Sequence, residues 1–148
     1  MVLLLIALLI CHYLADFCLT WPALIRSKAD GRNVWPIVLH AAVHAVLMGV
    51  CLLVFGVTME QLFLLMSLEL VTHFIIDVGK ATVSVKLPLL ADIKQKPYWV
   101  LFGLDQLLHQ LVVAVIWYVA VFNSIWFWLI ENKCLNLWQI NYVLITNN

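Results

Sequence analysis

The chain has 148 residues, of which 66% are hydrophobic and only 11% are charged, and its mean hydropathy is +1.05. Soluble domains are about 45–50% apolar and about 25% charged, so this composition excludes an ordinary soluble globular protein. Eight basic and eight acidic side chains cancel, so no charge excess indicates a nucleic-acid partner. Because a spanning helix needs about 20 apolar residues, the sequence predicts a single membrane domain over residues 1–148.

Apolar runs separated by polar segments predict an all-α fold with four transmembrane helices. The predicted spans are residues 2–23, 36–56, 61–79 and 98–122. The Trp-rich tail, residues 123–148, is interrupted by Glu131–Lys133, and its last apolar piece, Cys134–Ile145, is too short to span a bilayer. We therefore expect an interfacial helix in the tail.

The short loops predict an orientation. Three Lys and Arg lie between the first two spans, four lie between the third and fourth, and none lies between the second and third. The positive-inside rule then places both basic loops in the cytoplasm of a bacterial inner-membrane protein, with both termini in the periplasm. The N-terminal run has no basic region or small-residue cleavage site, so we expect it to be a retained span.

The cysteines carry no metal or disulfide pattern. Cys11, Cys18, Cys51 and Cys134 have no Cys-x-x-Cys spacing, so we interpret them as small hydrophobic residues. On a helix, Cys11 and Cys18 lie about 100° or more from the direction of His12, so they should face lipid or a neighbouring helix.

Each predicted span contains a histidine with a second metal-capable residue four positions away. The pairs are His12 with Asp16, His40 with His44, His73 with Asp77, and Asp105 with His109. Residues four apart project from one helix face, and all four pairs fall in the predicted cytoplasmic half of the bilayer. The pairs can therefore meet in one layer. Glu69 lies one turn from His73 and is interpreted as a ligand, a general base or a buried partner of histidine.

Buried ionisable groups are costly unless they are paired or bind an ion, so this layer is a candidate metal site. Interhelical hydrogen bonds are the structural alternative for any one pair. The ligand set exceeds the four of a closed zinc site, and four carboxylates would balance two divalent ions. We expect one or two transition-metal ions, with Zn, Mn and Fe equally compatible with mixed imidazole and carboxylate ligands.

Four motifs carry a resemblance to a known family: His12-x-x-x-Asp16, His40-x-x-x-His44, His73-x-x-x-Asp77-x-x-Lys80 and Asp105-Gln106-x-x-His109. Together they resemble the domain-of-unknown-function family 3307 over about residues 8–120. The resemblance implies a small bacterial or phage integral membrane protein and brings no established activity. More distantly, the pattern is similar to inner-membrane metal-dependent hydrolases with His and Asp on transmembrane helices.

The leading hypothesis is a metal-dependent hydrolase acting on a lipid or lipid-linked phosphoester at the cytoplasmic leaflet. Metal sites of this kind lower the pKa of bound water to about 7, which supplies hydroxide where bulk water is scarce. Glu69 or Asp105 would take up protons, and Lys80, Arg26 and Arg32 would hold the anionic head group. Lys80 lies on the face of Asp77, where it could instead only snorkel.

Two other classes of function stay open. The same residues could form the ion site of a transition-metal or proton transport protein, for which a homodimer could supply the missing symmetry. A third hypothesis is an interaction protein whose buried metal only holds the bundle together and whose function lies in the Trp-rich tail. Its partner would be a second copy of the chain or another membrane protein. The basic loop at residues 80–97 is either a lid over the polar layer or a segment attracted to anionic lipid.

Overall fold

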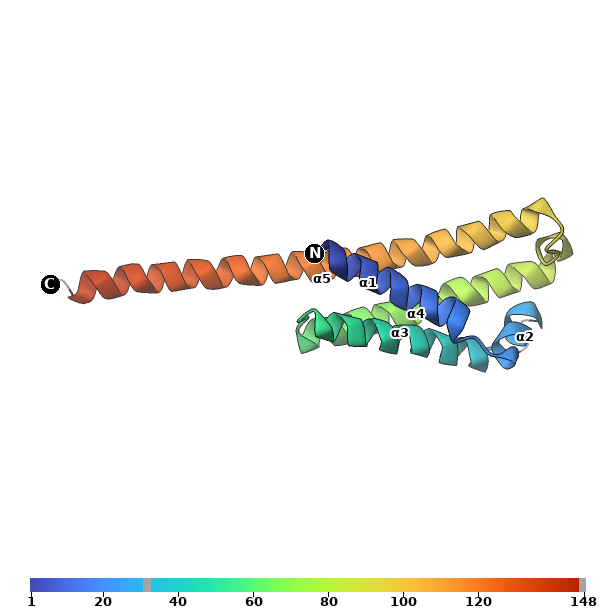
Figure 1. Cartoon of the computed structure of the whole chain (residues 1–148), viewed down its shortest axis with the longest axis horizontal. Coiled ribbons are helices and arrows are strands. Elements are labelled where there is room, and N and C mark those ends of the chain that lie inside the picture. Colours follow the sequence, from blue (N-terminus) through green and yellow to red (C-terminus); the bar gives the residue numbers. More distant parts are fainter. Residues whose placement is uncertain (31–32, 147–148) are drawn as a thin grey trace.

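The computed structural model describes the backbone of residues 1–30 and 33–146 and the side chains of residues 1–28 and 33–122. This part of the chain is helical and contains no strand, which confirms the all-α prediction (Figure 1). The helices in chain order are α1 (Val2–Tyr13), η1 (Leu14–Cys18), α2 (Pro22–Asp30), α3 (Trp35–Val54), α4 (Met59–Lys86), η2 (Pro88–Leu90) and α5 (Lys96–Thr146).

Three helices are long and apolar enough to cross a membrane: α3, α4 and the Lys96–Phe122 part of α5. Their length and apolar composition indicate a membrane protein. The fourth predicted span, residues 2–23, is not one straight helix, because Val2–Cys18 and Pro22–Lys28 are bent by 92° with respect to each other. A fourth span is present only if this bent pair counts as one.

The bend has a local cause. The amide of Leu19 bonds the carbonyl of Leu14 at 3.0 Å, five residues back, so η1 is a widened π-type turn. Pro22 follows, and proline lacks the N–H that would continue the helix and disfavours helical backbone at the preceding residue. α2 therefore begins in a new direction.

After the bend, α2 packs against α3 and α4. Its Leu24 is buried in a cluster with Ile37 of α3 and Ala81 of α4. α2 thus lies at the same end of the bundle as η2 (Figure 1), and Ile25 and Lys28 of α2 line one pocket together with Leu90 of η2.

α4 is longer than the predicted span 61–79. It begins after Thr58, whose hydroxyl accepts a hydrogen bond from the Gln61 amide at 3.4 Å, and it continues to Lys86. Residues 80–86 contain no helix breaker, and the helix ends only where Pro88 restricts Leu87 to extended backbone. The predicted loop 80–97 is therefore largely helical at its start, which reduces the connection to a short segment around η2.

α5 also differs from the prediction. It runs without a break from Lys96 to Thr146, so Glu131–Lys133 does not separate a span from a second helix (Figure 1). The interfacial position predicted for the tail concerns side chains outside the described ones and stays a prediction.

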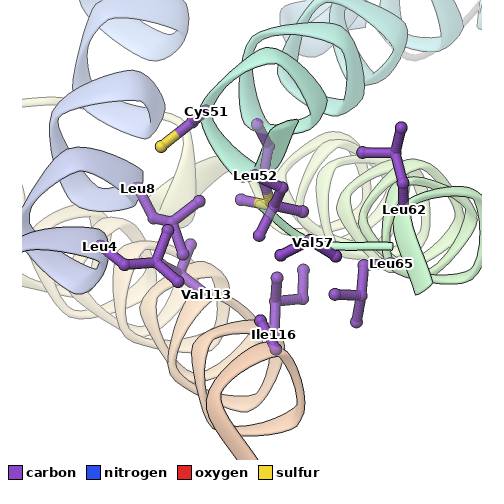
Figure 2. Close-up of a cluster of buried hydrophobic side chains, with 11 residues drawn as sticks. Leu4, Leu8, Cys51, Leu52, Val57, Leu62, Leu65, Val113 and Ile116 are labelled. Carbon is purple, nitrogen blue, oxygen red and sulfur yellow. The ribbon is translucent and has the colours of Figure 1, made fainter. Parts of the chain in front are cut away.

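An apolar core closes the end of the bundle that contains the N-terminus. Figure 2 shows side chains of α1, α3, α4 and α5 converging in this core. Its buried members are Leu4, Leu8, Met48, Cys51, Leu52, Val57, Leu62, Leu65, Val113, Ile116 and Ala120. The Trp117 indole also donates a hydrogen bond to the Met1 carbonyl at 2.9 Å, which ties the N-terminus to α5.

Candidate metal centre

The five histidines lie in one layer, one helical turn beyond the apolar core. They come from four helices, and all are buried. The ring centroids of His44 and His73 are 3.7 Å apart, those of His73 and His109 are 4.2 Å apart, and those of His12 and His44 are 4.8 Å apart. The structure thus brings together the histidines of all four predicted pairs.

Asp16 lies close to three of the five histidines. Its Oδ1 lies 3.1 Å from His40 Nε2 and 3.3 Å from His44 Nε2, and its Oδ2 lies 3.3 Å from His12 Nε2. The Gln106 side-chain amide donates to the same Oδ2 at 3.0 Å. Asp16 therefore connects three helices, and it does so from the widened turn η1.

Glu69 lies on the other side of the histidines. Its Oε1 is 3.3 Å from His73 Nδ1 and 3.8 Å from His44 Nδ1. The Glu69 side chain is only 2% exposed, whereas that of Asp16 is 8% exposed. Glu69 thus forms the deep end of the layer and Asp16 the end nearer to the surface.

Two lysines pair with the remaining carboxylates. Lys28 Nζ lies 2.7 Å from Asp77 Oδ2, and Lys80 Nζ lies 2.7 Å from Asp105 Oδ2. Lys28 was not among the predicted site residues, because it lies in the polar stretch that follows the first predicted span. Recognising Pro22 as the start of a helix that folds back would have indicated that a lysine could reach Asp77.

Several buried imidazole nitrogens have no hydrogen-bond partner among the described residues. They include His12 Nδ1, His40 Nδ1 and His109 Nε2. The other nitrogen of His109, Nδ1, lies 2.8 Å from the Asp105 carbonyl, an interaction that would leave Nε2 free to bind a ligand. Each unsatisfied buried polar atom costs about 1–3 kcal/mol of folding free energy. A bound ion would satisfy these nitrogens, so their arrangement favours an ion site over simple packing between helices.

Ligand atoms also lie close enough to share an ion. Three groups have candidate ligand atoms within 4.8 Å of one another, and His73 belongs to all of them. The groups are His12, His44, Glu69 and His73; Asp16, His40, His44 and His73; and His73, Asp77 and His109. Imidazole and carboxylate together suit first-row transition metals.

The net charge of the layer limits how many metal ions it could hold. Counted as four carboxylates, Asp16, Glu69, Asp77 and Asp105 contribute four negative charges, and Lys28 and Lys80 offset two of them. With neutral imidazoles, two negative charges would remain, which one divalent cation would balance. The four carboxylates without the lysines would instead balance two divalent ions, the upper number predicted from the sequence.

A cleft of about 160 Å³ leads into the layer beside Asp16. Its polar lining comes from Asp16, Thr20, Lys28, Lys80, Asp105 and Gln106. The side chains of Lys28 and Lys80 are 27% and 23% exposed, so both lysines are partly accessible where they line the cleft. The cleft can therefore admit an anionic group to the vicinity of Asp16.

The other predicted site residues lie elsewhere. Arg26 is exposed on α2 and does not line this cleft, and Arg32 lies outside the described residues. Cys11 is half-buried against the apolar core and Cys18 is exposed, so both face away from the histidines, as predicted.

Comparison with known proteins places the chain in a family. The sequence model of a protein family described as a protein of unknown function (DUF3307) matches residues 4–136. The chain belongs to the DUF3307 family. The match includes all five histidines of this DUF3307 protein, so the polar layer lies within the family's matched region. No curated protein and no solved structure matches the chain.

Proposed function

We propose that this protein is a metal-dependent hydrolase that acts on a lipid or lipid-linked phosphoester at the cytoplasmic leaflet. One observation carries the proposal: Asp16 belongs both to the histidine cluster and to the wall of a cleft that presents two lysines. A site that only held helices together would need neither the cleft nor the accessible ammonium groups.

A single divalent ion would be held by the four-residue group that borders the cleft through Asp16. This group consists of Asp16, His40, His44 and His73. Such an ion, when bound, supplies Lewis acidity toward phosphoryl oxygens and toward water. Glu69, which lies behind His73 and away from the cleft, would orient that imidazole and stabilise its ligating tautomer.

The lysines would bind the phosphate of the substrate. Lys80 directs one of its three donors at Asp105 Oδ2, 2.7 Å away, so two remain for phosphate oxygens. Lys28 forms an ion pair with Asp77 at 2.7 Å without donating a hydrogen bond to it, so its donors are also free for phosphate. These contacts would orient the ester at the end of the cleft beside Asp16.

Asp105 is the residue we assign to proton transfer. It lines the cleft and its second oxygen, Oδ1, has no hydrogen-bond partner among the described groups. The oxygen of water forms a new bond to phosphorus while the ester P–O bond breaks. Asp105 accepts the proton that the water loses and returns it to the leaving oxygen.

Transport of a transition metal or of protons is the second candidate. The three ligand groups share His73, so an ion could pass between them. However, each of Leu8, Met48, Leu65 and Val113 lies four residues from a member of the layer on its own helix and is buried in the apolar core. This core blocks the path beyond the layer, which favours hydrolysis over transport.

Phosphate or head-group release from vesicles tests the proposal. The purified full chain is reconstituted with a panel of anionic phospholipids and polyprenyl phosphates, with and without chelator. We expect chelator-sensitive release by the wild type and by the matched control Lys86→Met, whose lysine is exposed at the end of α4. Lys80→Met should keep its metal and lose most of the activity.

Two results would decide against hydrolysis. If metal-loaded protein releases nothing from any lipid while the vesicles take up Zn²⁺ or Mn²⁺, the transport function is correct. If neither occurs, the centre is structural and the protein acts through a partner.

A further inference from the structure

An apolar groove runs along the outer face between α4 and α5. Two adjoining hollows, of about 400 Å³ and 320 Å³, share Ile75, Ile76 and Leu108 and form one channel. We call it the α4–α5 groove. Its lining is mostly Leu, Ile and Val of the two helices, and it extends along α4 from Leu68 to Val83.

The charged lining of the groove is confined to one end. Lys80 and Asp105 lie there, and the same two residues line the cleft that leads to Asp16. Thr72, further along, directs its hydroxyl to the Leu68 carbonyl at 2.7 Å, so its hydrogen-bonding capacity is used within its own helix. The groove therefore has a charged mouth, where Lys80 is paired with Asp105, and a hydrocarbon interior.

The length of the groove corresponds to one membrane leaflet. From Lys80 to Leu68 the rise along α4 is about 18 Å. Half of the hydrocarbon core of a bilayer is about 15 Å. Under the predicted orientation, Lys80 lies toward the cytoplasmic interface and Leu68 toward the bilayer centre.

The lining favours a hydrocarbon chain over a neighbouring helix. Helices that pack closely in membranes use stripes of small residues, whereas this groove is lined by Leu, Ile and Val with Gly79 as its one glycine. Gly79 also leaves open space, because a Cβ built there would meet nothing within 4 Å.

We infer that the α4–α5 groove binds one acyl chain of an anionic phospholipid, whose phosphate is held at Lys80 beside the cleft. The inference rests on the proposed function for the idea that this phosphate is the reacting group. It makes the substrate class more specific: a lipid whose phosphate lies next to the start of its chain. The groove would bring such a lipid sideways from the leaflet, with its ester directed toward Asp16.

Photo-crosslinking of the full chain tests this site. The protein is reconstituted in phosphatidylcholine vesicles that contain phosphatidic acid with a photoreactive group in one acyl chain, and labelled residues are mapped by mass spectrometry. We expect labels concentrated on Ile75, Ile76 and Leu108, and competition by unlabelled phosphatidic acid but not by extra phosphatidylcholine.

Two matched glycine variants provide the control. Gly79→Phe fills the groove and should abolish the concentrated labelling, whereas Gly103→Phe, at an exposed glycine with equally open space outside the groove lining, should leave it unchanged. Metal content should be the same in both variants, which shows that the fold is retained.

Labelling spread evenly over lipid-facing residues of both helices, or unchanged in Gly79→Phe, would overturn the inference. So would conversion of a dimer into a monomer by Gly79→Phe, since the groove would then hold a second copy of the chain. The crosslinking experiment does not require the protein to hydrolyse the lipid. A negative hydrolysis assay therefore does not affect the test of lipid binding in the groove, and negative labelling does not affect the hydrolysis assay.

Discussion

At the scale of single residues, the pairing within each helix could be predicted and the pairing between helices could not. The four-residue spacing of His12 and Asp16 requires only helix geometry. The contacts of Asp16 with His40 and His44 depend on how α1 and α3 pack, and on the widened turn that directs Asp16 inward. The role of Lys28 depended on the direction of α2, which local sequence did not reveal.

Asp16→Asn tests the assignment of Asp16 as a metal ligand. The amide keeps the size of the side chain but removes the negative charge that faces three imidazoles, so we expect bound metal to fall to a small fraction of the wild-type content. Elemental analysis measures it, and Asp92→Asn, an exposed aspartate, is the control. Asp16→Glu should restore part of the metal. Full metal content in Asp16→Asn would contradict the assignment of this residue as a ligand.

Lys28→Met tests the charge balance. Removing this lysine leaves the buried Asp77 carboxylate unpaired, and because Lys28 is partly exposed we expect a destabilisation of about 2 kcal/mol. Asp77→Asn added to Lys28→Met should recover much of that loss. Reversible unfolding in detergent measures the free energies in a double-mutant cycle. Strictly additive effects would mean that the two residues do not interact.

At the scale of elements, helix presence was predictable and helix ends were less so. The apolar runs located α3, α4 and the first part of α5. The first predicted span crosses Pro22 and the third ends before Lys80, because apolar length alone defines both limits. Backbone chemistry set the actual limits, through Pro22 and Pro88.

A cysteine pair tests the packing of α2 on α4. In a variant without native cysteines, Leu24→Cys and Ala81→Cys should form a rapid crosslink, because both residues are buried in one cluster. Ile25→Cys with Ala81→Cys is the matched control, since Ile25 is 61% exposed. Gel mobility under non-reducing conditions measures the crosslink. Equal crosslinking of both pairs would show that α2 does not dock as described.

At the scale of the whole molecule, the polar layer lies between an apolar core and a cleft lined by charged side chains of both signs. The core was predictable as apolar residues on the faces that also bear the histidines. The cleft was not, because it is formed by residues of η1, α2, α4 and α5 that only the fold brings together. The bend in the first predicted span places α2 where its residues form one side of the cleft.

Cysteine accessibility in intact cells tests the orientation. The positive charges of α2 and of residues 86–96 predict that Asp92→Cys is protected from a membrane-impermeant thiol reagent and that Met59→Cys, at the opposite end of α4, is labelled. Both single cysteines are made in a variant without native ones. The reverse pattern would move the cleft to the outer leaflet.

The metal content of the purified protein decides whether the polar layer is a metal centre. Protein isolated without chelator from cells supplied with Zn, Mn and Fe is measured by elemental analysis beside two variants. We expect about one equivalent of transition metal in the wild type and in the exposed control Ser67→Ala, and loss in His73→Ala, which removes the residue common to all three ligand groups. Wild-type protein without metal, or His73→Ala with an undiminished content, would contradict this expectation.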